Sequence, residues 1–255
     1  MARTTGRLHP FLDHPRPIAF AHRGGALEVE ENTMAAFAHA VALGYSHVET
    51  DVQATRDGVA VIFHDDDLER MTGERGRLAE LTWDELSRCR TRGGERIPRL
   101  DEVLAAWPGL RINLEAKADA AVAPMAAAIA RAGALDRVCV GSFEARRTAR
   151  LRSLLGPGLL WSPAHAGVLS LWLRGWGLPA PRPDFGAVQV PTQYKGIPLV
   201  TPRFVRAAHA AGVQVHVWTV DEAAEMRRLL DLGVDGLMSD RPTLLKEVIA
   251  GRGGG

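Results

Sequence analysis

The sequence predicts an α/β protein whose fold class is a (β/α)8 TIM barrel with a small insertion after the second barrel strand. Three observations predict it. Eight short β-type runs alternate with helical runs, most of the helical runs stop at a glycine, and a length of 255 residues suits one such barrel. The same alternation leaves a doubly wound open sheet as the alternative architecture.

The expected strands are short runs rich in β-branched and other apolar residues. They cover residues 18–23, 47–52, 111–117, 137–143, 159–162, 187–190, 214–220 and 236–240. The expected helices have apolar residues that recur at helical spacing. They cover residues 33–43, 100–107, 121–132, 146–155, 167–176, 202–211, 222–232 and 242–250.

One segment after the second expected strand interrupts the alternation. Asp57-Gly58 between two β-type runs is a hairpin signal, so residues 59–63 should return antiparallel, outside the eight strands. Residues 65–99 are then irregular and polar, with one short helical piece at 83–89. We expect this insertion to cover one mouth of the barrel.

The ends of the chain are expected to lie outside the barrel. We expect residues 1–17 to form an N-terminal extension, residues 18–250 the barrel domain, and the glycine-rich residues 251–255 a flexible tail. The extension has basic side chains but lacks the apolar segment of a secretory signal, and the nearly apolar run at 167–180 is too short to span a bilayer. We therefore expect a cytoplasmic protein with no membrane span.

Composition excludes several other classes. The net charge is only +1 and no run of five Lys or Arg occurs, so no nucleic-acid partner is indicated. Cys89 and Cys139 are far apart and form no Cys-x-x-Cys motif, which argues against a disulfide framework and a cysteine zinc site.

Charged side chains gather where three of the expected strands end. They are His22, Arg23, Glu49, Asp51, Glu115 and Lys117. Residues two apart on a strand face the same side, and the strand ends of a barrel meet at one mouth, so the three carboxylates should lie together. They would repel one another there unless a divalent cation used them as hard oxygen ligands. We therefore predict a metal site at Glu49, Asp51 and Glu115; the alternative is a set of surface ion pairs.

A second histidine, His64, ends the expected extra strand. Two histidines at strand ends can bracket a substrate, one accepting and one donating a proton, because imidazole titrates near neutral pH. With Arg23 and Lys117 available to bind an anion, the site suits a phosphoester. The alternative is that His22 is a buried packing residue and Arg23 a surface charge.

The turn after the first strand carries two further expectations. Gly24 and Gly25 should let the backbone turn close to a ligand. Asn32, just before the first helix, is interpreted as its N-cap, with a role as a ligand as the alternative.

Taken together, these motifs resemble the glycerophosphodiester phosphodiesterases over residues 18–242. The resemblance rests on Ala21-His-Arg-Gly-Gly, Glu31-Asn-Thr, Glu49-Thr-Asp-Val, Thr55-Arg-Asp-Gly, Val61-Ile-Phe-His-Asp, Leu68-Glu-Arg, Leu114-Glu-Ala-Lys, Gly141-Ser-Phe, Val217-Trp-Thr-Val and Val234-Asp-Gly-Leu-Met-Ser-Asp-Arg-Pro. Two departures stand out: Glu30 replaces the usual proline before Glu31, and Ala116 replaces a branched residue.

The resemblance implies a TIM barrel and a role for each site residue. His22 and His64 would be general base and acid, and the three carboxylates would hold a divalent metal, commonly Ca²⁺ or Mg²⁺. Arg23 and Lys117 would contact the phosphate, Trp218 would line the glycerol pocket, and Phe143 is expected as a pocket wall. The products would be glycerol 3-phosphate and an alcohol, formed by attack of water or, through a cyclic phosphate, of the glycerol hydroxyl.

Two other functions stay open. A lysophospholipase D, or a lyase of the sphingomyelinase D kind, is kept open by the apolar segment 169–176, which either packs on the barrel or forms a lip for an acyl chain with peripheral membrane contact. A non-catalytic barrel that binds a phosphorylated small molecule is the third. The alcohol, the metal and the oligomeric state are left open.

Overall fold

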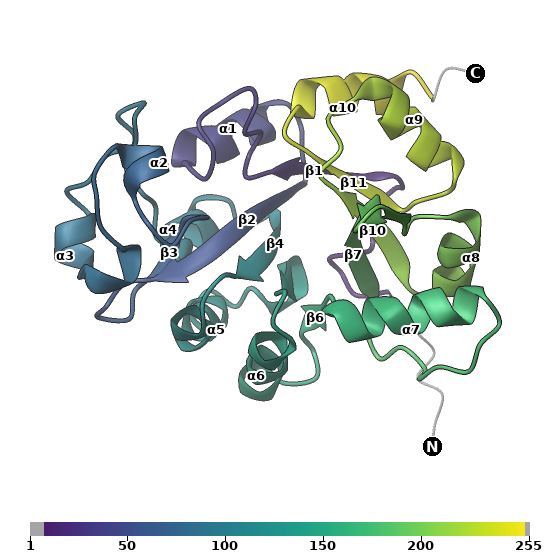
Figure 1. Ribbon diagram of the computed structural model, residues 1–255. Helices are drawn as coiled ribbons and strands as arrows, with labels where there is room; N and C mark the ends of the chain where they lie inside the picture. Colours follow the sequence, from purple (N-terminus) through teal and green to yellow (C-terminus); the bar gives the residue numbers. More distant parts are fainter. Residues whose placement is uncertain (1–7, 253–255) are drawn as a thin grey trace.

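Eight parallel strands follow one another around a barrel in the computed structural model, which describes residues 8–252 (Figure 1). They are β1 (Ile18–His22), β2 (His47–Ala54), β4 (Arg111–Ala116), β5 (Val138–Gly141), β6 (Leu160–Trp161), β7 (Ala187–Pro191), β10 (Gln214–Trp218) and β11 (Gly236–Ser239). Each pairs with the next one along the chain, and β1 pairs with β11, except that β6 and β7 are not paired. A side-chain contact spans this gap, since the Gln189 backbone N–H donates to Ser162 Oγ at 3.1 Å.

Helices follow the strands and cover the outside of the barrel. They are α1 (Met34–Ala42), α4 (Leu100–Ala106), α5 (Val122–Arg131), α6 (Ala145–Leu155), α7 (His165–Gly175), α8 (Pro202–Ala210), α9 (Ala223–Asp231) and α10 (Pro242–Ala250). Short 3₁₀ turns add Asp119–Ala121 and Leu135–Arg137. The predicted TIM barrel is confirmed, and the doubly wound alternative is wrong because the strand order never reverses its direction of winding.

The predicted hairpin and insertion follow β2. Strand β3 (Ala60–Ile62) pairs antiparallel with β2, and the insertion holds α2 (Glu69–Thr72), a 3₁₀ turn (Leu78–Glu80) and α3 (Trp83–Leu86). The insertion has a small apolar cluster of its own, which includes Phe63, Leu68 and Leu86. Figure 1 shows α2 and α3 on one side of the barrel and α7 on the other.

A second hairpin was not predicted from the sequence. It joins β8 (Gln193–Tyr194) to β9 (Ile197–Pro198), and all four of its strand residues are exposed. Its turn residues Lys195 and Gly196 have φ values of 49° and 81°, the left-handed pair that a type I′ turn needs.

The chain before β1 closes the N-terminal end of the barrel. Phe11 is fully buried, and its ring lies 6.2 Å from Phe20 and 5.0 Å from His47. At the other end, residues 251–252 form a turn after α10, whereas residues 253–255 of the predicted tail lie outside the described residues. In the described range, no helix combines the length and the apolar character that a membrane crossing requires.

Truncating Phe11 tests whether the N-terminal segment is part of the core. Phe11→Ala should lower the free energy of unfolding by about 3–5 kcal/mol, because it leaves a cavity beside Phe20 and His47. Leu8→Ala, at a side chain that is already exposed, should change it by less than about 0.5 kcal/mol. Urea denaturation measures both values, and equal values would contradict a structural role for Phe11.

Candidate active site

A cleft of about 1180 Å³ opens at the C-terminal ends of the barrel strands. It is lined by the nine residues that the sequence assigned to catalysis, substrate binding or the metal, namely His22, Arg23, Glu49, Asp51, His64, Glu115, Lys117, Phe143 and Trp218. The fold therefore gathers residues that lie up to two hundred positions apart in the chain, whereas their chemical roles stay predictions.

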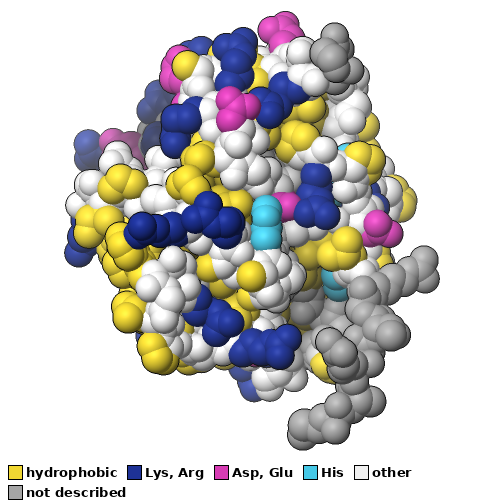
Figure 2. All heavy atoms as spheres, turned by 90° about the vertical axis from the view of Figure 1, so that its right-hand side faces the viewer, with side chains coloured by type: hydrophobic (Ala, Val, Ile, Leu, Met, Phe, Trp, Pro, Cys, Tyr) yellow, Lys and Arg dark blue, Asp and Glu magenta, His cyan; other side chains and the backbone are white. Residues whose placement is uncertain are grey.

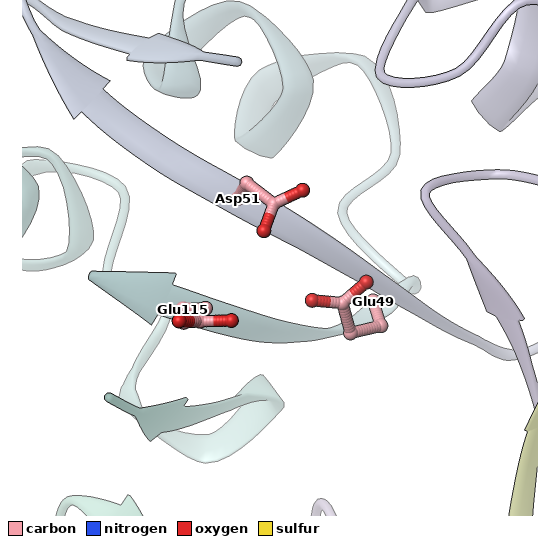
Figure 3. A group of neighbouring side chains, drawn as sticks. All are labelled: Glu49, Asp51 and Glu115. Atoms are coloured by element: carbon pink, nitrogen blue, oxygen red, sulfur yellow. The ribbon is translucent and has the colours of Figure 1, made fainter. Parts of the chain in front are cut away.

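Three carboxylates converge at one end of this cleft (Figure 3). Glu49 and Asp51 point to the same face of β2, and the parallel register pairs Asp51 with Glu115 on β4. One oxygen from each lies within 4.8 Å of the others, and Glu49 and Asp51 are buried. The arrangement brings three negative charges into a poorly hydrated space.

Two cations balance part of that charge. Arg23 Nε lies 3.1 Å from Asp51 Oδ2, and Lys117 Nζ lies 3.5 Å from Asp51 Oδ1 and 3.4 Å from Glu115 Oε1. Burial alone would raise the pKa of Asp51, but Arg23 and Lys117 outweigh it and hold this pKa below its ordinary value. Burial also raises the pKa of Glu115, where the charge of Lys117 opposes the effect and that of Asp51 adds to it.

His22 lies between Glu49 and a further carboxylate, that of Asp240. Its Nδ1–H donates to Asp240 Oδ1 at 2.6 Å, and its Nε2 lies 3.5 Å from Glu49 Oε2. Burial disfavours the charged imidazolium, but Glu49 and Asp240 outweigh burial and raise the pKa of His22 to about 9. Burial raises the pKa of Glu49, because a buried carboxylate charge is poorly solvated. The nearby charge of Asp51 raises this pKa further.

Asp240 is a site residue that the sequence analysis missed. Its backbone N–H donates to Asp221 Oδ1 at 2.8 Å, and the Ser239 hydroxyl donates to the same oxygen at 2.9 Å. These bonds fix the start of the loop that presents the Asp240 carboxylate to His22. The signal was available, because Asp240 ends the eighth predicted strand as His22-Arg23 ends the first.

The interpretation of Asn32 as a helix N-cap is wrong. Thr33 caps α1, since its hydroxyl accepts from the Ala36 N–H at 3.1 Å. Asn32 instead donates from Nδ2 to Asp51 Oδ2 at 3.0 Å and accepts from the Thr50 hydroxyl at 2.7 Å. It orients the central carboxylate, and its backbone has φ 59°, a left-handed conformation that asparagine tolerates.

The two glycines after His22 approach helices rather than the site. A Cβ on Gly24 would lie 2.6 Å from the Cβ of Ala36, and one on Gly25 would lie 2.7 Å from Pro242. Both have positive φ values, 85° and 114°. The expectation that they bring the backbone close to a ligand is therefore corrected: they let the turn pack against α1 and α10.

His64 is connected to the barrel through the insertion. Its Nδ1–H donates to Asp65 Oδ1 at 2.6 Å, and Arg70 Nε donates to Asp65 Oδ2 at 2.5 Å. Arg70 also donates to Glu31 Oε1 at 2.6 Å, and Arg23 donates to the same oxygen at 3.1 Å. A chain of alternating charges thus joins His64 to the turn that carries His22.

The insertion does not cover the cleft as expected. None of residues 65–99 lines it, because their apolar side chains pack in the separate cluster beside β3. The insertion reaches the site at its edge instead. Glu30, one of the two departures noted in the sequence, accepts from the Thr91 hydroxyl and, at 2.9 Å, from the Gly93 N–H.

The other end of the cleft is apolar. The rings of Phe143 and Trp218 meet edge to face at 5.8 Å, and His165 lies 6.2 Å from Phe143 and 5.7 Å from Tyr194. Beyond these rings the walls are Val168, Leu169, Trp172, Ile197 and Leu199, from α7 and the β8–β9 hairpin. The cleft thus combines a charged end with an apolar arm.

The charged end suits a divalent cation. Its donors are carboxylate oxygens alone, which Ca²⁺ and Mg²⁺ prefer, and they lie close enough together for a single ion. Lys117 and Arg23 offset only part of the charge of the three carboxylates, so a bound cation would relieve their remaining repulsion.

Comparison with known proteins gives a consistent result. Residues 22–244 match the sequence model of the Glycerophosphoryl diester phosphodiesterase family. A Mycobacterium tuberculosis protein named "Probable glycerophosphodiester phosphodiesterase 2" is 42% identical over 95% of this chain and 94% of its own length. A lysophospholipase D from Rattus norvegicus is 30% identical over 90% of this chain and 85% of its own.

A solved structure is similar over nearly the whole chain. It is a phosphodiesterase from Oleispira antarctica in complex with the product sn-glycerol-3-phosphate. Its TM-score is 0.79 at 25% identity, with 92% of this chain and 97% of that chain covered.

The pairing of His22 with Asp240 can be tested by titration. In metal-free protein, Asp240→Asn should lower the pKa of His22, because one of the two carboxylates that favour the imidazolium is removed. A raised pKa stabilises the folded state below the ordinary value of 6.5, and this contribution is lost as the pH rises through about 9. The variant should lose part of that pH-dependent stability.

NMR titration of the imidazole and denaturation at several pH values measure the two effects. Asp231→Asn, which removes an exposed partner of Arg252, is the matched control and should leave His22 unchanged. An unaltered His22 pKa in Asp240→Asn would contradict the pairing.

Proposed function

The chain belongs to the glycerophosphoryl diester phosphodiesterase family, and we propose that its cleft acts through a divalent metal and the two histidines. The enzyme hydrolyses glycerophosphodiesters to glycerol 3-phosphate and an alcohol. The observation that carries the proposal is the meeting, in one cleft, of three convergent carboxylates, two histidines and two cations.

We assign the metal to Glu49, Asp51 and Glu115, with Ca²⁺ or Mg²⁺ as the ion that an all-oxygen donor set favours. A bound cation supplies Lewis-acid charge that stabilises the negative charge developing on the phosphoryl oxygens. Arg23 and Lys117, both partly exposed to the cleft, bind the remaining phosphate oxygens. They can do so because a cation would neutralise Asp51 and Glu115, with which they now pair, while Arg23 keeps its contact with Glu31.

We assign the proton transfers to His22 and His64. Asp240 holds His22 Nδ1–H, and a cation bound at Glu49 would neutralise one of the two carboxylates that raise the pKa of His22. His22 Nε2, which lines the cleft, would then be free to accept the proton of the attacking oxygen. Asp65 holds His64 Nδ1–H in the same way, which leaves its Nε2 to protonate the departing alcohol. One phosphorus–oxygen bond forms and one breaks, and the proton gained at His22 equals the one lost from His64.

The attacking oxygen has two candidates. Water gives glycerol 3-phosphate directly, whereas attack by the neighbouring glycerol hydroxyl gives a cyclic phosphate that water then opens. Trp218 and Phe143 form the wall against which the glycerol would lie. The division into residues 1–17, 18–250 and 251–255 and the cytoplasmic location stay predictions.

The apolar arm favours a second candidate substrate. Leu169, Trp172 and Ile197 line the cleft beyond Phe143, where they could receive the acyl chain of a lysophospholipid. The similarity to a lysophospholipase D agrees with this candidate. Product analysis on glycerophosphocholine beside lysophosphatidylcholine, with and without EDTA, distinguishes the two substrates and tests metal dependence at once.

Removing one carboxylate should impair metal binding. Glu49→Gln or Glu115→Gln should weaken metal affinity and activity on the order of 10²-fold. Replacing a residue that merely hydrogen-bonds to a metal ligand already costs about 10–100-fold, and these two carboxylates would bind the metal directly. Glu28→Gln, in a carboxylate that pairs with His39 outside the cleft, is the matched control. Calorimetric metal titration and rates after chelation measure the effects, and full activity of either variant after exhaustive chelation would refute the metal assignment.

Replacing each histidine separates their roles. His22→Ala and His64→Ala should each reduce the rate on the order of 10²–10⁴-fold, and the double variant should lose less than the product of the two effects. A nitrophenyl diester needs little protonation on departure, so it should rescue only the variant that lacks the acid, expected to be His64→Ala. His39→Ala serves as control. Equal rescue of both variants, or of neither, would contradict the assignment of His22 as the base and His64 as the acid.

A further inference from the structure

One face of α7 presents a row of large apolar side chains beside the cleft. His165, Leu169, Trp172 and Trp176 follow one another at spacings of four, three and four residues, which places them on the same side of the helix. Leu169 and Trp172 line the cleft, whereas Trp176 lies at the C-terminal end of the helix with 55% of its surface exposed. The row therefore leads from the cleft to the outer surface.

The β8–β9 hairpin extends this apolar surface. His165 on α7 contacts the ring of Tyr194, and Tyr194 and Ile197 are both exposed at the edge of the cleft. We call the exposed apolar residues of this region the α7 rim; they are Leu169, Trp176, Leu178, Tyr194 and Ile197. Large apolar side chains exposed together usually mark an interaction surface.

The charged residues in the stretch of chain that carries the α7 rim are almost all of one sign. Between residues 162 and 220 the chain has five basic residues and a single acidic one, and they are Arg174, Arg182, Lys195, Arg203, Arg206 and Asp184. Asp184 is already paired with Arg152 on α6. The full chain has a net charge of only +1, so this region is far more basic than the rest.

Two of these cations lie directly over aromatic rings of the α7 rim. The Arg203 guanidinium lies 4.3 Å from the centre of the Trp176 ring, and Lys195 Nζ lies 5.5 Å from that of Tyr194. Arg174 is exposed, four residues before the exposed Leu178. The lower left part of Figure 2 shows hydrophobic and basic side chains together, with no acidic ones among the described residues drawn there.

We propose that the α7 rim docks the mouth of the cleft on an anionic lipid surface. Tryptophan and tyrosine favour the membrane interface, because their rings are apolar at one end and polar at the other. Basic side chains beside them add attraction to anionic headgroups. A second copy of this chain would bring the same basic surface against itself, which disfavours a dimer through the α7 rim.

Vesicle binding tests the proposal without any need for hydrolysis. The full-length enzyme is sedimented with vesicles of phosphatidylcholine, and with vesicles that also contain phosphatidylserine. We expect binding at least about tenfold tighter to the anionic vesicles and weaker at high salt, because salt screens the headgroup charge. Equal binding to both kinds of vesicle, or none to either, would overturn the proposal.

Two variants at residues outside the cleft identify the surface. Trp176→Ser with Leu178→Ser removes apolar contact, and Arg174→Glu with Lys195→Glu and Arg203→Glu reverses the charge. We expect the charge variant to lose binding on the order of 10²-fold, since each basic side chain at an anionic surface contributes about fivefold. We expect the apolar variant to lose at least about tenfold. Leu154→Ser on α6, and Arg75→Glu with Arg88→Glu and Arg131→Glu, are matched controls at exposed positions and should bind normally.

Activity on a water-soluble glycerophosphodiester separates this proposal from the proposed function. Both α7 rim variants should keep that activity, since none of their residues lines the cleft. Vesicle binding retained by the variants, or lost equally by the controls, would place the contact elsewhere and overturn the proposal. A dimer in sedimentation velocity that Trp176→Ser dissociates would also overturn it, in favour of a second copy. An inactive enzyme that still binds vesicles through the α7 rim would count against the proposed function alone.

Discussion

The repulsion among Glu49, Asp51 and Glu115 is the constraint on which the rest of the site depends. The strand register of β2 and β4 leaves no freedom to separate these carboxylates, and burial makes each charge harder to solvate. The surrounding elements therefore end in cations. Arg23 follows β1 and Lys117 follows β4, and each lies within ion-pair distance of Asp51. A phosphate bound here would meet cations whose position is already fixed.

Local strain and long-range bonds hold the turn after β1 in place. Arg23 and Asn32 both have positive φ values, which cost free energy in residues with a Cβ. The two are joined by a hydrogen bond from the Asn32 N–H to the Arg23 carbonyl at 2.9 Å, and Asn32 is anchored to Thr50 and Asp51 on β2. Glu31, between them, binds Arg70 of the insertion. Through this turn the insertion supports both histidines without lining the cleft.

The sequence predicted the barrel and the gathering of the site because both follow from short-range rules. Alternating strands and helices, with glycines after most helices, were enough for the eight β/α units, and the two-residue period of a strand was enough to place Glu49 beside Asp51. Contacts set by packing were not predictable. Asn32 was expected to cap α1 because asparagine suits both a helix cap and an αL turn. The insertion was expected to cover the cleft, but its apolar residues pack in a cluster of their own. The β8–β9 hairpin was missed because its strands are two residues long, although Lys195-Gly196 was a turn signal.

The charged and apolar ends of the cleft come from different stretches of the chain. Every residue assigned to the metal, the phosphate and the proton transfers precedes residue 118, whereas the apolar arm comes mainly from residues 143–199. Selection for a new leaving alcohol can therefore act on one contiguous segment. A library of variants restricted to α7 and the β8–β9 hairpin would sample substrate range while the reacting groups are inherited unchanged. Gene recombination between relatives at two crossovers, near residues 118 and 200, would exchange the apolar arm as a unit and leave Asp240 with His22.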